Sequence, residues 1–108
     1  MKTGPKIWVP SADIVNPIDG QILITSGPLP SPGSWLLSLV GQCDASFQYR
    51  VLARFANVIL AKRRPAAGDV DLLIPNHQPL VLGEIIDVIC TGGATANLHL
   101  TLHGILLE

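Results

Sequence analysis

The last quarter of the chain, residues 83–108, alternates apolar and polar side chains, and this pattern constrains the fold more than any other feature. Alternation with a period of two is typical of a β-strand that buries one face. The segment Ala96–Leu107 follows it almost throughout, so we expect a strand there and not a helix. One parity holds Ala96, Leu98, Leu100, Leu102, Gly104 and Leu106, and the other holds Asn97, His99, Thr101 and His103.

The preceding segment, Glu84–Thr91, repeats the pattern, with Ile86, Val88 and Cys90 on its buried side. The residues between the two segments are Gly92, Gly93 and Ala94. Small side chains and the permissive φ of glycine suit a tight reversal of the chain. We therefore predict that the two segments form a hairpin.

The opposite faces of these two segments are more apolar than one small sandwich requires. Ile85 and Ile89 flank Asp87 in the first segment, and the second ends with Ile105 and Leu107 on its otherwise polar side. Charged residues make up 14% of the chain, against a usual ~25%. Large exposed apolar patches on soluble proteins usually mark interfaces. We expect part of this surface to be buried against other chains, and the alternative is an ordinary small β domain with an apolar surface.

The middle of the chain predicts further short strands separated by turns. No window shows sustained helical periodicity, and a chain of 108 residues has room for one domain. About seven or eight short strands favour an all-β, antiparallel β-sandwich of the jelly-roll type, with an up-and-down barrel as the alternative. The expected strands are Ser34–Gln42, Phe47–Phe55, Val58–Lys62 and Val70–Ile74, and the buried face of the second holds Phe47, Tyr49, Val51, Ala53 and Phe55.

Residues 1–33 contain six of the nine prolines, which disfavour helix and central strands. We expect residues 1–20 to form an extended arm and residues 21–108 to form the sandwich, beginning with a short strand at Gln21–Ser26. Two alternatives stay open for the arm: it packs along its own domain or a crystal neighbour, or it embraces a sister subunit or a larger scaffold. The apolar residues of the arm and of the final strand are the predicted partner-binding residues: Ile7, Trp8, Val9, Ile105 and Leu107.

The charges are nearly balanced, with seven basic and eight acidic residues and a net charge of −1. Such a chain has no global field that attracts nucleic acid or anionic lipid. Lys62, Arg63 and Arg64 form one basic cluster, for which we expect a salt-sensitive contact with an acidic protein surface. Nucleic acid is an unlikely partner because exposed aromatic side chains that would stack on bases are missing. No run approaches the ~20 apolar residues of a membrane span, so we expect a soluble, unexported protein.

The sequence predicts no cofactor, no metal site and no enzyme. His99 and His103 share a strand face, but four strand residues separate their Cα atoms by about 13 Å, too far to share one ion. His77 falls in a separate loop, and no serine lies in a G-x-S-x-G motif. Cys43 and Cys90 have the inward parity and are expected to be free thiols, although a disulfide between them stays open.

Three segments carry a resemblance to a known family. They are SGPLPSPGSWLLSLVG (26–41), FQYRVLAR (47–54) and LGEIIDVICTGGATANLHLTLHGILLE (82–108). With Pro32 and Gly33 before the first long strand, a Gly83–Glu84 step and a terminal strand after a small-residue turn, the chain resembles small jelly-roll virion proteins of tailed bacteriophages. These are head decoration (cement) proteins and related tail or fibre modules. The resemblance covers about residues 21–108.

This resemblance implies a non-enzymatic virion component that is commonly trimeric, binds the major capsid protein or another virion protein, and stabilises the assembled head. It implies a location on the capsid surface, after assembly in the host cytoplasm. A tail, neck or fibre component is the first alternative. A carbohydrate-binding module is the second, and it needs exposed aromatic platforms. The candidates are Trp8, Trp35 and Tyr49, of which the last two have the parity of the core.

Overall fold

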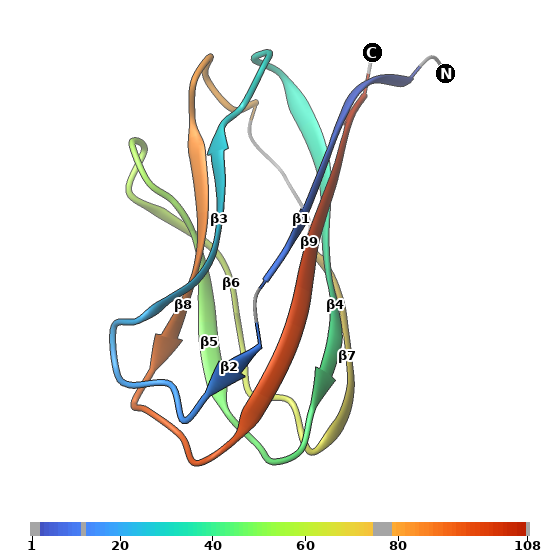
Figure 1. Ribbon diagram of the computed structural model, residues 1–108. Coiled ribbons are helices and arrows are strands. Elements are labelled where there is room, and N and C mark those ends of the chain that lie inside the picture. The colour runs from blue at the N-terminus through green and yellow to red at the C-terminus, as the bar shows by residue number, and fades with distance from the viewer. Residues whose placement is uncertain (1–2, 12, 75–78, 108) are drawn as a thin grey trace.

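The computed structural model describes residues 3–11, 13–74 and 79–107, and its described residues form strands and loops without a helix (Figure 1). Accordingly, no described helix is long and apolar enough to cross a membrane. The all-β prediction is confirmed. The strands are β1 (Thr3–Pro10), β2 (Ile14–Val15), β3 (Ile22–Pro28), β4 (Ser34–Cys43), β5 (Gln48–Ala53), β6 (Val58–Arg63), β7 (Gly68–Ile74), β8 (Ile85–Thr91) and β9 (Asn97–Leu107).

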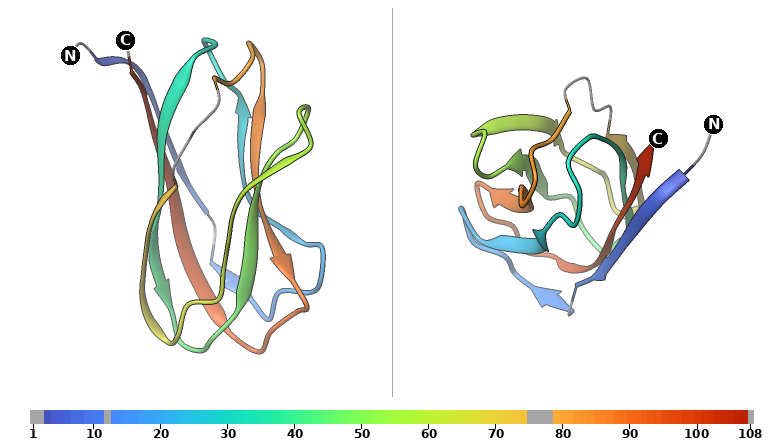
Figure 2. Two further views of the ribbon diagram at one scale, coloured as in Figure 1. Left: turned by 180° about the vertical axis from the view of Figure 1, so that it is seen from behind. Right: turned by 90° about the horizontal axis from the view of Figure 1, so that it is seen from above.

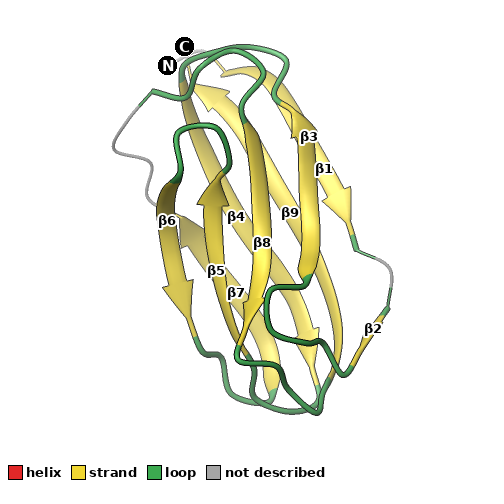
Figure 3. Cartoon of the chain, turned by 90° about the vertical axis from the view of Figure 1, so that its left-hand side faces the viewer, coloured by secondary structure: helices red, strands yellow, loops and turns green. Residues whose placement is uncertain are grey.

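The strands form two antiparallel sheets that face each other (Figure 3). Sheet A has the order β1-β9-β4-β7, with the short β2 paired to the beginning of β9, and sheet B has the order β3-β8-β5-β6. Leaving β2 aside, the eight longer strands divide four and four, as in a jelly roll. The predicted β-sandwich is confirmed, and the two separate sheets exclude the barrel alternative.

The predicted hairpin of the last two strands is wrong. β8 lies in sheet B between β3 and β5, whereas β9 lies in sheet A between β1 and β4. Gly92 and Gly93, with φ values of 80° and 70°, do reverse the chain, but they carry it across the sandwich. The crossing turns the apolar faces of both strands toward each other. In a hairpin both faces would lie on the same side of a single sheet.

The core lies between the sheets and follows the predicted alternation. β4 contributes Trp35, Leu37 and Leu39, and β9 contributes every second residue from Leu98 to Leu106. Gly104 belongs to this inward series for a steric reason. A Cβ added there would lie 2.8 Å from Ile7 Cγ1 and 2.9 Å from Leu37 Cδ2. Glycine at position 104 therefore leaves room for the side chains of Ile7 and Leu37.

Residues 3–10 are extended and form the edge strand of sheet A. β1 runs beside β9 along nearly its whole length (Figure 2). Its register places Ile7 opposite Gly104 and Trp8 opposite His103. Of the two alternatives, residues 3–10 thus show the packing along their own domain. The edge position tolerates proline, which cannot donate a backbone hydrogen bond. β3 begins after a turn at Asp19–Gly20, in agreement with the expected strand at Gln21–Ser26.

Phe55 was expected on the buried face of its strand, but it is 65% exposed. The alternation stops because β5 ends at Ala53 and a turn follows. Glu84 fixes this turn. Its Oε1 accepts hydrogen bonds from the Phe55 N–H (2.7 Å) and the Ile85 N–H (2.9 Å), and its Oε2 accepts one from the Ala56 N–H (3.1 Å). A carboxylate almost thirty residues away therefore sets where the strand ends.

The two cysteines are buried free thiols in different sheets. Cys43 ends β4 and its Sγ donates to the Ala66 carbonyl oxygen at 3.3 Å. Cys90 lies in β8, where burial raises its pKa. The expectation of free thiols is confirmed.

Candidate interaction surface

The outer side of sheet A carries a group of apolar side chains from three neighbouring strands. The strand register places Ile105 of β9 beside Leu36 of β4. Trp8 of β1 lies beside His103, two residues from Ile105 on the same side of β9. Trp8 is 66% exposed, Leu36 39% and Val40 36%, whereas Ile105 and Leu107 are half-buried. We call these five residues the outer apolar face. They alternate with core residues along each strand, so the pleat forces them toward the outside.

Trp8 is held in place by its neighbour on β9. Its ring meets the ring of His103 edge to face, with centroids 5.1 Å apart and an interplanar angle of 69°. This geometry is favourable for aromatic pairs. Trp8 is therefore a positioned apolar side chain that still presents most of its surface to the outside.

The structure divides the predicted partner-binding residues into two sets. Trp8, Ile105 and Leu107 lie on the outer side of sheet A, whereas Ile7 and Val9 point to the other side of β1 and pack against the core. Leu36 and Val40 were not predicted, although both are apolar residues at the outward parity of Ser34–Gln42. Apolar residues at the outward positions of this strand are the sequence pattern that could have predicted them.

Sheet B does not have a comparable apolar excess on β8. Ile89 is only 8% exposed and Ile85 is half-buried. The chain itself thus covers much of the outward side of β8, which was expected to be buried against another chain. Asp87 between them is 2% exposed and binds the Arg54 guanidinium with two hydrogen bonds, Nε to Oδ2 at 2.7 Å and Nη2 to Oδ1 at 2.9 Å. This contact raises the pKa of Arg54 and neutralises the buried carboxylate.

The basic cluster lies at the end of β6. Lys62, Arg63 and Arg64 are all exposed. Lys62 pairs with Arg50 on the outer side of sheet B, whereas Arg63 pairs with Tyr49, whose side chain is in the core. Arg64 Nη2 donates to the side-chain oxygen of Gln48 at 3.0 Å. Lys62 and Arg64 therefore lie toward the outer side of sheet B, beside Arg50 and Gln48, whereas Arg63 has the opposite parity.

Tyr49 lines a groove of about 310 Å³ together with the end of β6, the connection 64–67 and the beginning of β7. It is 1% exposed, and burial raises its pKa to about 12, against a smaller lowering by Arg63. Trp35 is also 1% exposed. Both aromatic rings thus belong to the core, as their parity predicted, and Trp8 alone of the three candidate platforms is exposed.

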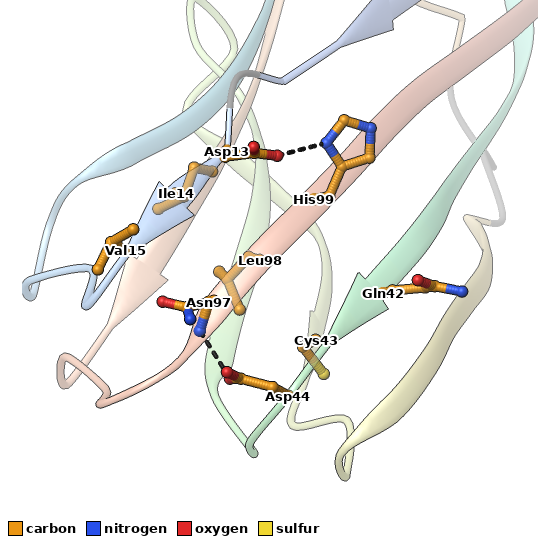
Figure 4. Close-up of a pocket in the computed structure, with 9 residues that line it drawn as sticks. All are labelled: Asp13, Ile14, Val15, Gln42, Cys43, Asp44, Asn97, Leu98 and His99. Atoms are coloured by element: carbon orange, nitrogen blue, oxygen red, sulfur yellow. Dashed lines mark hydrogen bonds and ion pairs between the residues drawn. The ribbon is translucent and has the colours of Figure 1, made fainter.

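A second depression, of about 420 Å³, lies where β2, the end of β4 and the beginning of β9 meet (Figure 4). Asp13 Oδ1 lies 3.1 Å from His99 Nδ1 at its rim, and both side chains are exposed. Asp44 Oδ1 accepts a hydrogen bond from the Asn97 N–H at 2.7 Å. Within residues 3–11, 13–74 and 79–107 no group of three or more His, Cys, Asp or Glu side chains could hold a metal ion, and His77 lies outside the described residues.

Comparison with known proteins assigns this chain to no family. No protein-family model matches the sequence, and no curated protein matches it. A chain in the solved structure of infectious bursal disease virus, Gx strain, is similar with a TM-score of 0.41 and 12% sequence identity. The similarity covers 94% of this chain and 32% of the viral chain, so this chain spans about a third of that length. A likeness at this level says nothing about function.

Proposed function

We propose that this chain is a non-enzymatic structural protein of a tailed-phage virion, a decoration protein that binds the assembled head through the outer apolar face. One observation carries the proposal: Trp8, Leu36 and Val40 are exposed together on one sheet. Apolar side chains that gather on a surface usually mark a protein interface. The resemblance of residues 26–41, 47–54 and 82–108 to decoration proteins supplies the kind of partner, a virion shell.

The chemistry of the outer apolar face suits such a contact. Tryptophan is enriched among the residues that dominate binding energy, particularly when it is fixed before binding and surrounded by groups that exclude water. Trp8 is fixed by His103, and half-buried Ile105 lies on the same face. A shell offers many identical sites, so even a modest affinity at each site gives high occupancy and stabilises the assembled state. A trimer, as the resemblance implies, would add avidity.

Three carboxylates that the fold buries or uses at the ends of strands have structural partners, which fits a protein without catalytic chemistry. Glu84 holds the turn after β5, and Asp87 holds Arg54. Asp44 holds the first backbone N–H of β9. Each of these carboxylates is used to fix the backbone or to neutralise a neighbouring charge.

The test is the number of copies that bind to a head. The Trp8→Lys variant places a charge in the outer apolar face without touching the core, because Trp8 is 66% exposed. We expect at least a tenfold loss of affinity for heads of the encoding phage that lack the protein, measured by co-sedimentation. The matched control is Ile18→Lys, which changes an equally exposed residue (69%) in the loop before β3.

Undiminished binding of Trp8→Lys, with an unchanged circular dichroism spectrum, would contradict the proposal. Point variants are preferable to removal of residues 1–20. That truncation would remove β1 and β2 from sheet A and leave one long edge of β9 unpaired. It would also remove the core contacts of Ile7 and Val9. Attachment to tails or fibres, with none to heads, would instead support the alternative location.

A further inference from the structure

We propose that copies of this chain associate edge to edge, with β6 of one copy lying against β7 of the next. The partner is thus a second copy of the same chain, and the surface is the side of the sandwich opposite β1 and β3. This inference deepens the proposed function by naming where the copies meet, and it rests on that function only for the expectation of three copies. The outer apolar face remains available for the shell.

The first argument is that both strands have an open edge on the same side. β6 pairs with β5 and is the last strand of sheet B, and β7 pairs with β4 and is the last strand of sheet A. Figure 3 shows the two strands at the same side of the molecule, one in each layer, running in opposite directions. Backbone groups on an open strand edge are a template for pairing with another chain.

The second argument is that the two edges carry opposite charges. β6 ends with Lys62 and Arg63, and β7 begins with Gly68 and continues through Asp69 and Asp71. All four charged side chains are exposed. The ion pairs in the described part of the chain are Arg54–Asp87 and His99–Asp13. The two opposite sets are therefore close in the chain but not neutralised within one molecule.

Geometry brings these sets together between copies. Because β6 and β7 run in opposite directions, rotation about an axis parallel to the strands places β6 of one copy antiparallel to β7 of the next. Sheet B of the first copy then continues into sheet A of the second. Residues 64–67 join the two strands, so Lys62, Asp69 and Asp71 lie at the same end of the sandwich. Lys62 of one copy therefore meets the aspartates of its neighbour.

The same arrangement matches the apolar ends of the two strands. Ile59 lies opposite Leu52 on the outer side of sheet B, and Leu73 lies opposite Ser38 on the outer side of sheet A. They are 56% and 61% exposed. β6 carries one extra residue between Ala61 and Ile59, where its register shifts by one. With this bulge, antiparallel pairing that sets Lys62 beside Asp71 also sets Ile59 beside Leu73. Opposite charges and apolar pairs between neighbouring strands both stabilise a sheet.

The contact closes upon itself. Each copy presents both edges on one side, so β6 to β7 and β7 to β6 contacts form together around one axis, in a pair or in a ring of three. Closed rings of this kind use every complementary edge and leave none for further growth. The groove of about 310 Å³ that Arg63, the connection 64–67 and the beginning of β7 line then borders the contact at one end of the two strands.

Charge reversal tests the inference on the isolated protein. We compare Lys62→Glu/Arg63→Glu, Asp69→Lys/Asp71→Lys and the fourfold variant that combines them, using sedimentation velocity over a range of concentrations. Each double variant puts like charges on facing edges, and we expect its dissociation constant to rise at least tenfold. The fourfold variant restores opposite charges, and we expect it to associate like the wild type. Wild-type association should also weaken with added salt.

The matched control is Asp13→Lys, which reverses an exposed charge near β2, away from the β6 and β7 edges. It should associate like the wild type, and circular dichroism confirms that all variants fold. A monomeric wild type, or double variants that associate as it does, would overturn the inference. This assay contains no virus particle. A failure of the predicted self-association would therefore leave the proposed binding to heads, which Trp8→Lys tests, unaffected.

Discussion

Glu84 provides a sharp test of how this sandwich is held together. Its side chain is 0% exposed, and its carboxylate accepts hydrogen bonds from three backbone N–H groups. Two of them, from Phe55 and Ala56, belong to the turn between β5 and β6. Replacement of Glu84 by alanine therefore removes the link between the beginning of β8 and that turn, and it opens a space in the structure.

The size of the effect follows from the contacts. A hydrogen bond to a charged group contributes about 1.5–3 kcal/mol to stability. The two contacts to the turn together give about 3–5 kcal/mol, because the turn is exposed and its freed N–H groups can regain part of the energy from water. In a domain of this size, 1 kcal/mol corresponds to about 4–8 °C in melting temperature. We therefore expect Glu84→Ala to melt roughly 12–40 °C below the wild type.

Urea and thermal unfolding followed by circular dichroism measure this loss. Glu84→Gln keeps the shape and one acceptor oxygen, so it should lose about half as much stability as the alanine variant. Asp13→Ala serves as a control because its partner His99 is exposed, and exposed pairs contribute about 0–1 kcal/mol. A Glu84→Ala protein within about 1 kcal/mol of the wild type would refute this account of the turn.

Two further predictions concern the core and the strand spacing. Spectrophotometric titration reports Tyr49 alone, since the chain has one tyrosine, and the folded protein should form tyrosinate only near its raised pKa of about 12. The tyrosine of the unfolded chain loses its proton near pH 10. The free energy of unfolding should therefore fall between pH 10 and 12 by roughly 1.4 kcal/mol per pH unit. Ionisation of Tyr49 near pH 10 in the folded protein would contradict its burial. Gly41→Ala should cost about 3 kcal/mol in urea unfolding, because its Cβ would lie 2.0 Å from the His99 carbonyl oxygen. The control Gly20→Ala also has positive φ but meets nothing within 4 Å, and an equal loss in both variants would contradict the close approach of β4 to β9.

The strands could be predicted from the sequence because alternation records a local property, the burial of one face. It identified β9 and β8 correctly, and it separated the core side of β4 from its outer side. Where a strand ends is less local. The parity of β5 continues to Phe55, but the chain turns there because Glu84, distant in sequence, accepts the backbone N–H groups of the turn.

Strand partners could not be predicted, because they depend on residues far apart in the chain. Gly92 and Gly93 signal a reversal in either a hairpin or a crossing between sheets. The pairing of β9 with β1 and β4 decides between them. The prolines of the first strand indicated an extended backbone in the same way, without showing that β9, almost a whole chain length away, is its partner.

The candidate surface could be predicted only in part, because strand pairing decides which apolar side chains the chain itself covers. Trp8 and Ile105 interrupt a polar context and were found, whereas Leu36 was overlooked on the outward side of a strand whose inward side drew attention. Ile89 was expected to need a partner chain, but it is 8% exposed within this one. Sequence shows which side chains are apolar, and only the pairing of strands shows which of them the chain itself can cover.

The account depends most on the claim that the outer apolar face is buried against a virion shell. A density map of intact virions of the encoding phage tests this claim directly. We predict jelly-roll density on the head, with the outer side of sheet A toward the shell and Trp8 at the contact. Virions without this density, or bound copies whose Trp8 faces solvent while another side of the sandwich meets the shell, would contradict it.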